Sequence, residues 1–348
     1  MSKPSSKRRR KDSESGGTGS GSETDAPLTV TFKRSKYWFD DGNVILQAED
    51  TQFRVHRSML AHQSAVFKDM FGMPQPEQPQ DAMLDGCPIV PLGDKAADVE
   101  HVLAVFYDNY NSFDLRKQLA MSPLSAFLRL GKKYGIEFLQ NEALKRLRRD
   151  FPTTLEAYDE SFKGQDILLE GEGNVAFKKM SQSVILLALE TSISSVLPSA
   201  YLTYVSTTPA EEILSGKDDE QLPLSIVAAS ALGRDKICRF ILENTQTWWT
   251  SDSVMPRQAC ATLNNCRPLR NQAIKELASE FHLSDTGLVA NLSPWSEYGE
   301  NGPIKTNVCR QCIASLKECH ENLRKGVWQR LPGFFGLEEW EKLKDFDN

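Results

Sequence analysis

The chain has 348 residues, of which 40% are hydrophobic and 25% charged, and its formal net charge at pH 7 is −6. This length suggests about two domains, and an acidic chain is not expected to coat nucleic acid through its whole surface. Its seven cysteines do not indicate a disulfide framework, and its aliphatic runs are far shorter than the roughly 18 to 20 residues that cross a bilayer. We therefore expect a soluble intracellular protein with reduced thiols.

Residues 1–36 are predicted to be a disordered tail. Residues 1–27 contain no aromatic or branched aliphatic side chain, so they cannot bury enough apolar surface to offset their chain entropy. Within the tail lies the basic run Lys7, Arg8, Arg9, Arg10 and Lys11. Such a run is either a solvated basic tail or a nuclear-import signal. We therefore expect the protein in the nucleus or the cytoplasm, with the run favouring the nucleus.

A β-hairpin is the first structured element that the sequence predicts. Residues 43–47 (NVILQ) are rich in branched apolar side chains, and residues 53–56 (FRVH) alternate between apolar and polar. The residues between them are typical of a turn. A third strand is expected at residues 87–92 (CPIVPL), at the edge of the sheet because of its two prolines.

Two short helices are expected after the hairpin. Ser58 is placed to cap the first, and Ser64 is placed to cap the second, whose apolar stripe stops at Gly72. No acidic partner follows at a spacing typical of a catalytic triad. We therefore interpret His56, Arg57 and Ser64 as structural residues. Longer helices are predicted near residues 94–107, 122–135 and 136–151 from apolar positions at helical spacing.

These elements together resemble the BTB/POZ domain over residues 37–151. The positions that share the family's spacing are Asp41, Val44, Phe53, Val55, His56, Arg57, Leu60, Ser64, Phe67 and Phe71. The chain is most similar to fungal members of the family, in which a loop like residues 75–80 and a strand like residues 86–90 follow. The resemblance implies an α+β fold, a small sheet packed on a cluster of helices.

The resemblance also implies protein partners, including a second copy of the chain. The family's dimers form through the first helix, which here implies Arg57, Ser58, Met59, Leu60, His62 and Gln63. Some members instead bind cullin scaffolds of ubiquitin ligases. This sequence departs from the common pattern after Tyr107 and shows no clear cullin-binding motif there, which places cullin binding in doubt.

Residues 152–348 are predicted to form an all-α C-terminal domain with a core separate from that of the first domain. Apolar-faced segments alternate with Pro, Gly and Ser throughout this part. Trp248 and Trp249 are interpreted as core residues at a helix end. The closing segment, residues 331–346, is expected to pack back on the helices.

Four cysteines of the C-terminal domain have spacing that suggests a zinc site. Cys260 and Cys266 form one close pair, and Cys309 and Cys312 form a second at the start of an amphipathic helix. Zinc prefers four thiolate or imidazole ligands in a tetrahedron, and His320 is the expected substitute ligand. The alternatives are buried free thiols and a redox pair. Structural zinc is the only cofactor that the sequence suggests.

The sequence as a whole favours a protein–protein interaction protein, an adaptor or scaffold, over an enzyme. No nucleophile, base or cofactor loop stands in a catalytic context. A nuclear transcriptional regulator and a ubiquitin-ligase substrate adaptor are the alternatives. Direct nucleic-acid binding is not expected, because no zinc-finger ladder, helix-turn-helix or basic zipper is visible.

Overall fold

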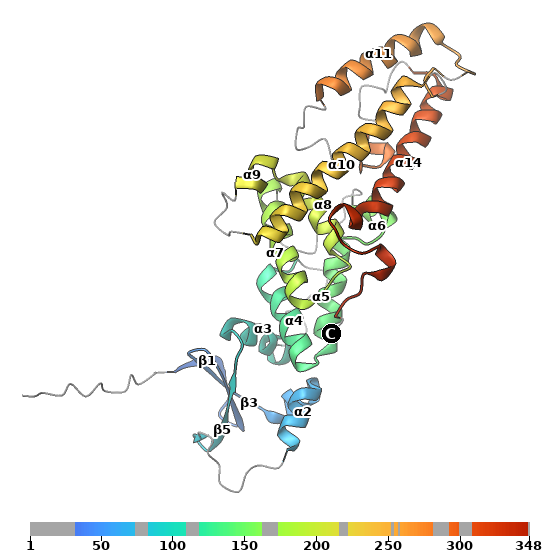
Figure 1. Cartoon of the computed structure of the whole chain (residues 1–348). Coiled ribbons are helices and arrows are strands. Elements are labelled where there is room, and N and C mark those ends of the chain that lie inside the picture. Colours follow the sequence, from blue (N-terminus) through green and yellow to red (C-terminus); the bar gives the residue numbers. More distant parts are fainter. Residues whose placement is uncertain are drawn as a thin grey trace, which may run out of the picture.

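The computed structural model describes residues 32–73, 83–108, 118–161, 173–215, 222–251, 254–256, 258–280, 292–298 and 308–346. These residues form an elongated molecule with a small β-sheet at one end and helix α11 at the other (Figure 1). The basic run Lys7–Lys11 lies outside the described residues. Among the described helices, none is long and apolar enough to cross a membrane.

The sheet has five strands in the order β1-β3-β2-β5-β4. Their bounds are β1 Lys33–Trp38, β2 Val44–Ala48, β3 Thr51–Val55, β4 Met83–Leu84 and β5 Cys87–Leu92. The central pair β2–β3 is antiparallel, and the flanking strands β1 and β5 run parallel to their neighbours β3 and β2. The apolar side chains of the central pair are fully buried, which explains why this hairpin was recognisable from sequence.

Two features of the sheet differ from the prediction. Strand β1 begins at Lys33, inside the segment predicted to be a tail, and its exposed basic side chains hid its strand character. Strand β5 is not at the edge, because β4 pairs with Cys87 and Pro88 on the side away from β2. Pro91 is nevertheless tolerated on that side, because the two-residue β4 does not extend far enough to pair with it.

The helices described in the first part of the chain are α1 Arg57–Gln63, α2 Ala65–Gly72, α3 Ala96–Tyr107, α4 Met121–Tyr134 and α5 Glu137–Asp150. Ser64 caps α2 as predicted, since its Oγ accepts a hydrogen bond from the Phe67 amide at 3.0 Å. Ser58 does not cap α1, because the helix already begins at Arg57 and its N-cap is His56. Helix α4 ends at Gly135 in a left-handed conformation that suits glycine.

The second part of the chain is helical, as predicted. Its helices are α6 Leu155–Ser161, α7 Gly173–Thr191, α8 Leu197–Thr207, α9 Ala210–Ser215, α10 Leu224–Thr250, α11 Leu263–Glu280, α13 Trp295–Tyr298 and α14 Arg310–Phe334, with the 3-10 helix η2 Trp340–Lys342 near the end. Helices α10 and α14 lie side by side and extend away from the sheet (Figure 1). The side chains of Trp248 and Trp249 lie outside the described residues.

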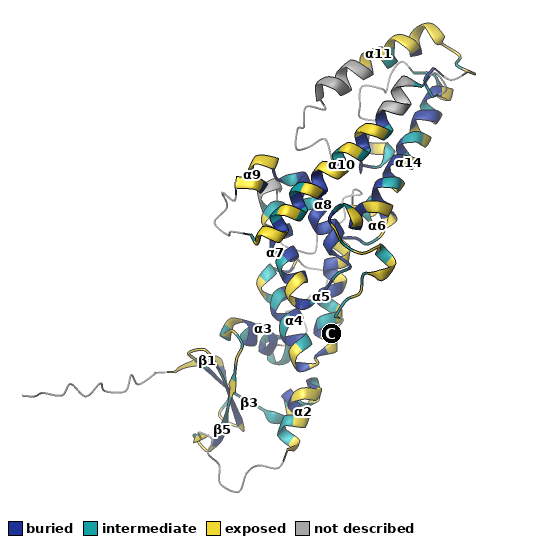
Figure 2. Ribbon diagram, viewed as in Figure 1, coloured by how far each residue is buried: buried dark blue, intermediate teal, exposed yellow. Residues whose placement is uncertain are grey.

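The two parts share one apolar core, so the prediction of separate cores is wrong. A continuous cluster of buried side chains, here called the main core, extends from Tyr37 in β1 to Phe335 after α14. Helices α4 and α7 join the parts, and Arg129 of α4 pairs with Glu190 of α7 at 2.7 Å. Figure 2 shows buried residues running from the sheet through the helices.

The C-terminal segment packs back on the helices, as expected. Trp340 stacks on Trp328 with ring centroids 5.7 Å apart, and its indole N–H donates to the Trp328 carbonyl. Farther on, the Asp345 carboxylate accepts hydrogen bonds from Arg148 at 2.7 Å and from the Ser195 hydroxyl at 2.6 Å. Because Arg148 belongs to α5, the last residues of the chain tie its two parts together.

Candidate metal centre and interaction surface

The predicted interaction residues on α1 differ in their exposure. Ser58 and His62 are exposed, while Arg57, Met59 and Gln63 are half-buried. Leu60 is 1% exposed and packs in the main core. Leu60 therefore supports α1 from beneath and is not available to a partner.

Arg57 is held in place by contacts within the fold. Its amide donates to the side-chain oxygen of Asn43 at 2.8 Å, and its guanidinium donates to the Phe71 carbonyl at 3.1 Å. The guanidinium also lies over the Phe71 ring, 4.9 Å from its centroid. These contacts fix α1 against the end of α2, and of the six predicted interaction residues Met59 is the apolar one that stays partly accessible.

The histidine and the serine of this region lie in different hydrogen-bond networks. His56 contacts the Asp41 carboxylate through Nε2 at 3.2 Å and the Tyr107 hydroxyl through Nδ1 at 3.2 Å. Ser64 instead donates to the Tyr134 carbonyl and caps α2. The two residues do not form a nucleophile–base pair, in agreement with their structural interpretation. The hydrogen bond from His56 also lowers the pKa of the Asp41 carboxyl.

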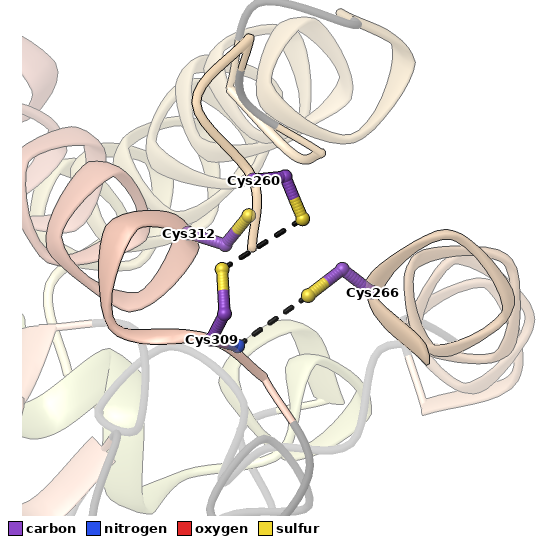
Figure 3. Close-up of side chains that lie close together, drawn as sticks. All are labelled: Cys260, Cys266, Cys309 and Cys312. Carbon is purple, nitrogen blue, oxygen red and sulfur yellow. Dashed lines mark hydrogen bonds between the residues drawn. The ribbon is translucent and has the colours of Figure 1, made fainter. Parts of the chain in front are cut away.

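Four cysteine side chains converge at the end of the molecule farthest from the sheet. The sulfur atoms of Cys260, Cys266, Cys309 and Cys312 all lie within 4.8 Å of one another. Figure 3 shows them pointing toward one another from three segments: the loop before α11, the first turn of α11 and the start of α14. We call this group the cysteine cluster. It contains the four cysteines whose spacing predicted a zinc site.

Local structure explains how the cluster forms. Cys309 is the N-cap residue of α14 and Cys312 lies one turn later, so their side chains lie on the same side of the helix start. Cys266 enters at the start of α11, where its amide donates to the Thr262 carbonyl at 2.9 Å. The Cys309 amide in turn donates to the Cys266 sulfur at 3.4 Å. Backbone N–H groups aimed at sulfur favour its thiolate form.

The pKa values of the two partly exposed thiols, Cys260 and Cys309, are shifted in opposite directions. Loss of solvation acts to raise the pKa of the Cys309 thiol, but hydrogen bonds from the backbone amides of Cys312 and Ala261 outweigh it and lower that pKa to about 6. Loss of solvation raises the pKa of the Cys260 thiol, whose sulfur lies 3.7 Å from that of Cys309. Sequence reasoning missed the Ala261 and Cys312 amides, because backbone donors leave no residue-type signal.

His320 does not join the cluster, so the prediction of a substitute ligand is wrong. It lies eight residues after Cys312 in α14, a separation of about 12 Å along a helix. Its ring is 1% exposed and packs edge-on against Trp295 at 5.6 Å between centroids. The histidine is a core residue of α14.

The dimensions of the cysteine cluster suit a single tetrahedral ion. Zinc–sulfur bonds of about 2.3 Å in a tetrahedron place the sulfurs about 3.8 Å apart, and the Cys260 and Cys309 sulfurs are 3.7 Å apart. A set of four thiolates selects soft or borderline metals such as zinc or iron over magnesium and calcium. A cluster of several irons would hold its cysteines farther apart, since metal and sulfide lie between them.

Comparison with known families identifies the part of the chain that contains the sheet. Residues 36–150 match the BTB/POZ domain. The matched segment extends from β1 through α5, so the chain has a BTB/POZ domain followed by a helical region, as the sequence analysis predicted. The BTB/POZ domain is known for protein–protein interaction and is not typically enzymatic. No curated protein matches the chain significantly, so its likeness to fungal members stays a prediction.

Proposed function

We propose that the protein is an adaptor that associates through its BTB/POZ domain with a second copy of itself. The match of residues 36–150 to a protein-interaction domain carries this proposal. The arrangement of α1 supports it, because buried Leu60 and the contacts of Arg57 hold Met59 on a fixed helix. An apolar side chain on a fixed helix can be buried against its own copy in a two-fold symmetric dimer.

Sedimentation velocity of the full chain at micromolar concentrations tests self-association. A dimer should form, and Met59→Glu should weaken it by about tenfold or more, which corresponds to about 1.4 kcal/mol. The matched control is Leu232→Glu, which changes an exposed leucine of α10 that is remote from the BTB/POZ domain. A chain that remains monomeric throughout would contradict the homodimer and leave association with other proteins to be tested by affinity capture.

We further propose that one zinc ion binds the thiolates of the cysteine cluster, as the spacing of the four cysteines predicted. The convergence of four sulfurs within 4.8 Å supports it. So does the local packing, because among the described residues the cluster has four buried members, Met255, Cys266, Cys312 and Leu316, with partly buried side chains such as Leu269 and Trp295 packed against them. A core with so little buried apolar surface usually needs a disulfide or a metal ion to hold its segments together.

The alternatives for the cysteines account for less of this geometry. Buried free thiols behave as small apolar side chains, but Cys260 and Cys309 are partly exposed and have polar partners. A thioredoxin-like redox pair follows a strand, whereas Cys309 is preceded by Val308 in irregular backbone. Four convergent ligands with amide donors around them are the arrangement expected of a structural zinc site.

Metal analysis of the full chain tests the zinc site. We expect about one equivalent of zinc, and replacement by cobalt should give the absorption bands of a tetrahedral thiolate complex. Cys266→Ser should abolish metal binding. Cys319→Ser is the matched control, because Cys319 lies in α14 outside the cluster. Less than about a tenth of an equivalent of zinc would contradict the proposal, since a structural site should be nearly full.

We propose that the basic run Lys7–Lys11 directs nuclear import, because such runs in tails are recognised as import signals. A reporter fused to residues 1–31 should accumulate in the nucleus, and substitution of the five basic residues by alanine should abolish accumulation. A uniform reporter distribution would favour a solvated tail. Nuclear import with bound chromatin proteins would favour the transcriptional regulator, and capture of a cullin would favour the ubiquitin-ligase adaptor.

A further inference from the structure

The cysteine cluster has a solvent-facing half and a buried half. Cys266 and Cys312 are 0% exposed and belong to the small apolar cluster with Met255 and Leu316. Cys260 and Cys309 are partly exposed, and they come from different segments, the loop before α11 and the start of α14. Oxidants reach thiolates according to their exposure. An oxidant in solution should therefore react with Cys260 and Cys309 faster than with Cys266 and Cys312.

We propose that Cys260 and Cys309 are a modification site, at which hydrogen peroxide joins the two sulfurs as a disulfide and expels the metal. This inference rests on the proposed zinc site. The two sulfurs are already 3.7 Å apart and face each other across the cluster (Figure 3). A disulfide bond places its sulfurs about 2.05 Å apart. The two sulfurs therefore need to approach each other by only about 1.7 Å to form one.

The chemistry proceeds in two steps that balance. One exposed thiolate attacks a peroxide oxygen, the O–O bond breaks, and a sulfenic acid and hydroxide form. The second exposed thiolate then attacks the sulfenic sulfur, the S–S bond forms and a second hydroxide leaves. The two sulfurs lose two electrons, which the peroxide oxygens gain, and two protons from solvent convert the hydroxides to water. Zinc keeps its charge throughout.

Loss of the metal follows from the number of ligands that remain. After oxidation only Cys266 and Cys312 still offer thiolates, and two ligands do not complete a tetrahedral site. Cys312 is the competing partner for Cys309, because the two lie one helical turn apart. Its full burial in the apolar cluster disfavours attack through it, and this burial is why we assign the disulfide to Cys260 and Cys309.

The consequence is structural and confined to one end of the molecule. Among the described residues, the apolar cluster has four buried members, of which Cys266 and Cys312 are themselves proposed ligands. We expect this cluster to be too small to keep the loop before α11 and the start of α14 packed after the metal leaves. The main core does not include this cluster. Oxidation should therefore loosen the segments around the cluster and leave the BTB/POZ domain unchanged.

The test treats the zinc-loaded full chain with submillimolar hydrogen peroxide. A chromogenic chelator follows zinc release, and mass spectrometry of unreduced peptides maps the disulfides. We expect one zinc ion released for each Cys260–Cys309 disulfide formed, and dithiothreitol with added zinc should restore the starting state. The control is the double variant Cys238→Ser and Cys319→Ser, which removes two half-buried thiols outside the cluster. Its release rate should stay within about twofold of wild type, because exposure of the cluster is unchanged.

The outcomes separate this inference from the zinc proposal. A chain that carries no zinc before treatment overturns both. A zinc-loaded chain that keeps its metal in peroxide, or that releases it with a Cys309–Cys312 disulfide, overturns the modification site alone. Release that disappears in the Cys238 and Cys319 double variant also overturns it, because the reactive thiols would then lie outside the cluster.

Discussion

Helix α14 passes through two regions that are stabilised in different ways. From Leu323 onward its buried side chains belong to the main core, which also contains the sheet and α4. Near its start, Cys312 and Leu316 belong to a cluster of four buried residues beside the convergent thiols. One helix thus joins a large apolar core to a small one.

The two regions of the chain obtain their stability from different sources. The main core removes enough apolar surface from water to hold the BTB/POZ domain and the helical region together. The small cluster has four buried members among the described residues, and there we expect the proposed metal to supply a cross-link. The border between the two regions falls within α14, between Leu316 and Leu323, and not at the boundary between the BTB/POZ domain and the helical region.

The largest expected effect comes from the same substitution in each region of α14. Leu331 is 0% exposed in the main core and Leu316 is 2% exposed in the small cluster. Leu331→Ala should reduce the free energy of unfolding by about 2 to 5 kcal/mol. Leu316→Ala should leave the global transition nearly unchanged while faster hydrogen exchange appears around the cysteine cluster. Denaturant unfolding combined with exchange mass spectrometry measures both, and equal global losses would remove the distinction between the regions.

A glycine substitution tests how closely α10 and the end of α14 pack in the main core. A Cβ atom at Gly233 would overlap the Phe335 ring, which also stacks on Tyr201. Gly233→Ala should therefore destabilise the protein by about 1 to 3 kcal/mol through overpacking. The control is Gly333→Ala, where a Cβ would meet nothing within 4 Å. Thermal unfolding should separate the two variants, and equal melting temperatures would contradict this packing.

The tie between the chain end and α5 should have a smaller effect. The Asp345 carboxylate is 5% exposed and accepts hydrogen bonds from Arg148, the Ser195 amide and the Ser195 hydroxyl. Asp345→Ala should cost about 1 to 2 kcal/mol, because the serine groups lose their acceptor while half-exposed Arg148 regains water. Chemical denaturation measures the loss. A double-mutant cycle with Arg148→Ala that shows no coupling would contradict the ion pair.

The smallest effect is expected at the exposed Asp41 beside the sheet. The hydrogen bond from His56 lowers the Asp41 pKa below its unfolded value, so the folded state binds fewer protons and gains stability above the unfolded pKa. This gain is lost as the pH falls through the folded pKa. Asp41→Asn should slightly lower the melting temperature at neutral pH, and the difference from wild type should shrink below about pH 4. Asp69→Asn on the exposed face of α2 is the control, and a pH-independent difference would contradict the interaction.

Local patterns in the sequence predicted the elements that depend on near neighbours. The β2–β3 hairpin, the Ser64 cap and the end of α4 at Gly135 follow from alternation, capping and backbone preference over a few residues. The spacing of the four cysteines also drew attention to them. Strand β1 escaped prediction because its exposed charged side chains resemble a tail, and its pairing with β3 is a long-range event.

The order of residues in the chain was therefore enough to predict the BTB/POZ domain, the helical second part and the four thiols suited to bind a metal. The tertiary structure decided that the two parts share one core, that Leu60 points inward and that His320 lies outside the cysteine cluster. It also brought Cys260 to Cys309 across the gap of 49 positions between them. The physical reason is that propensity and capping act between neighbours in the chain, whereas burial and metal-ligand geometry depend on segments that meet only in the folded state.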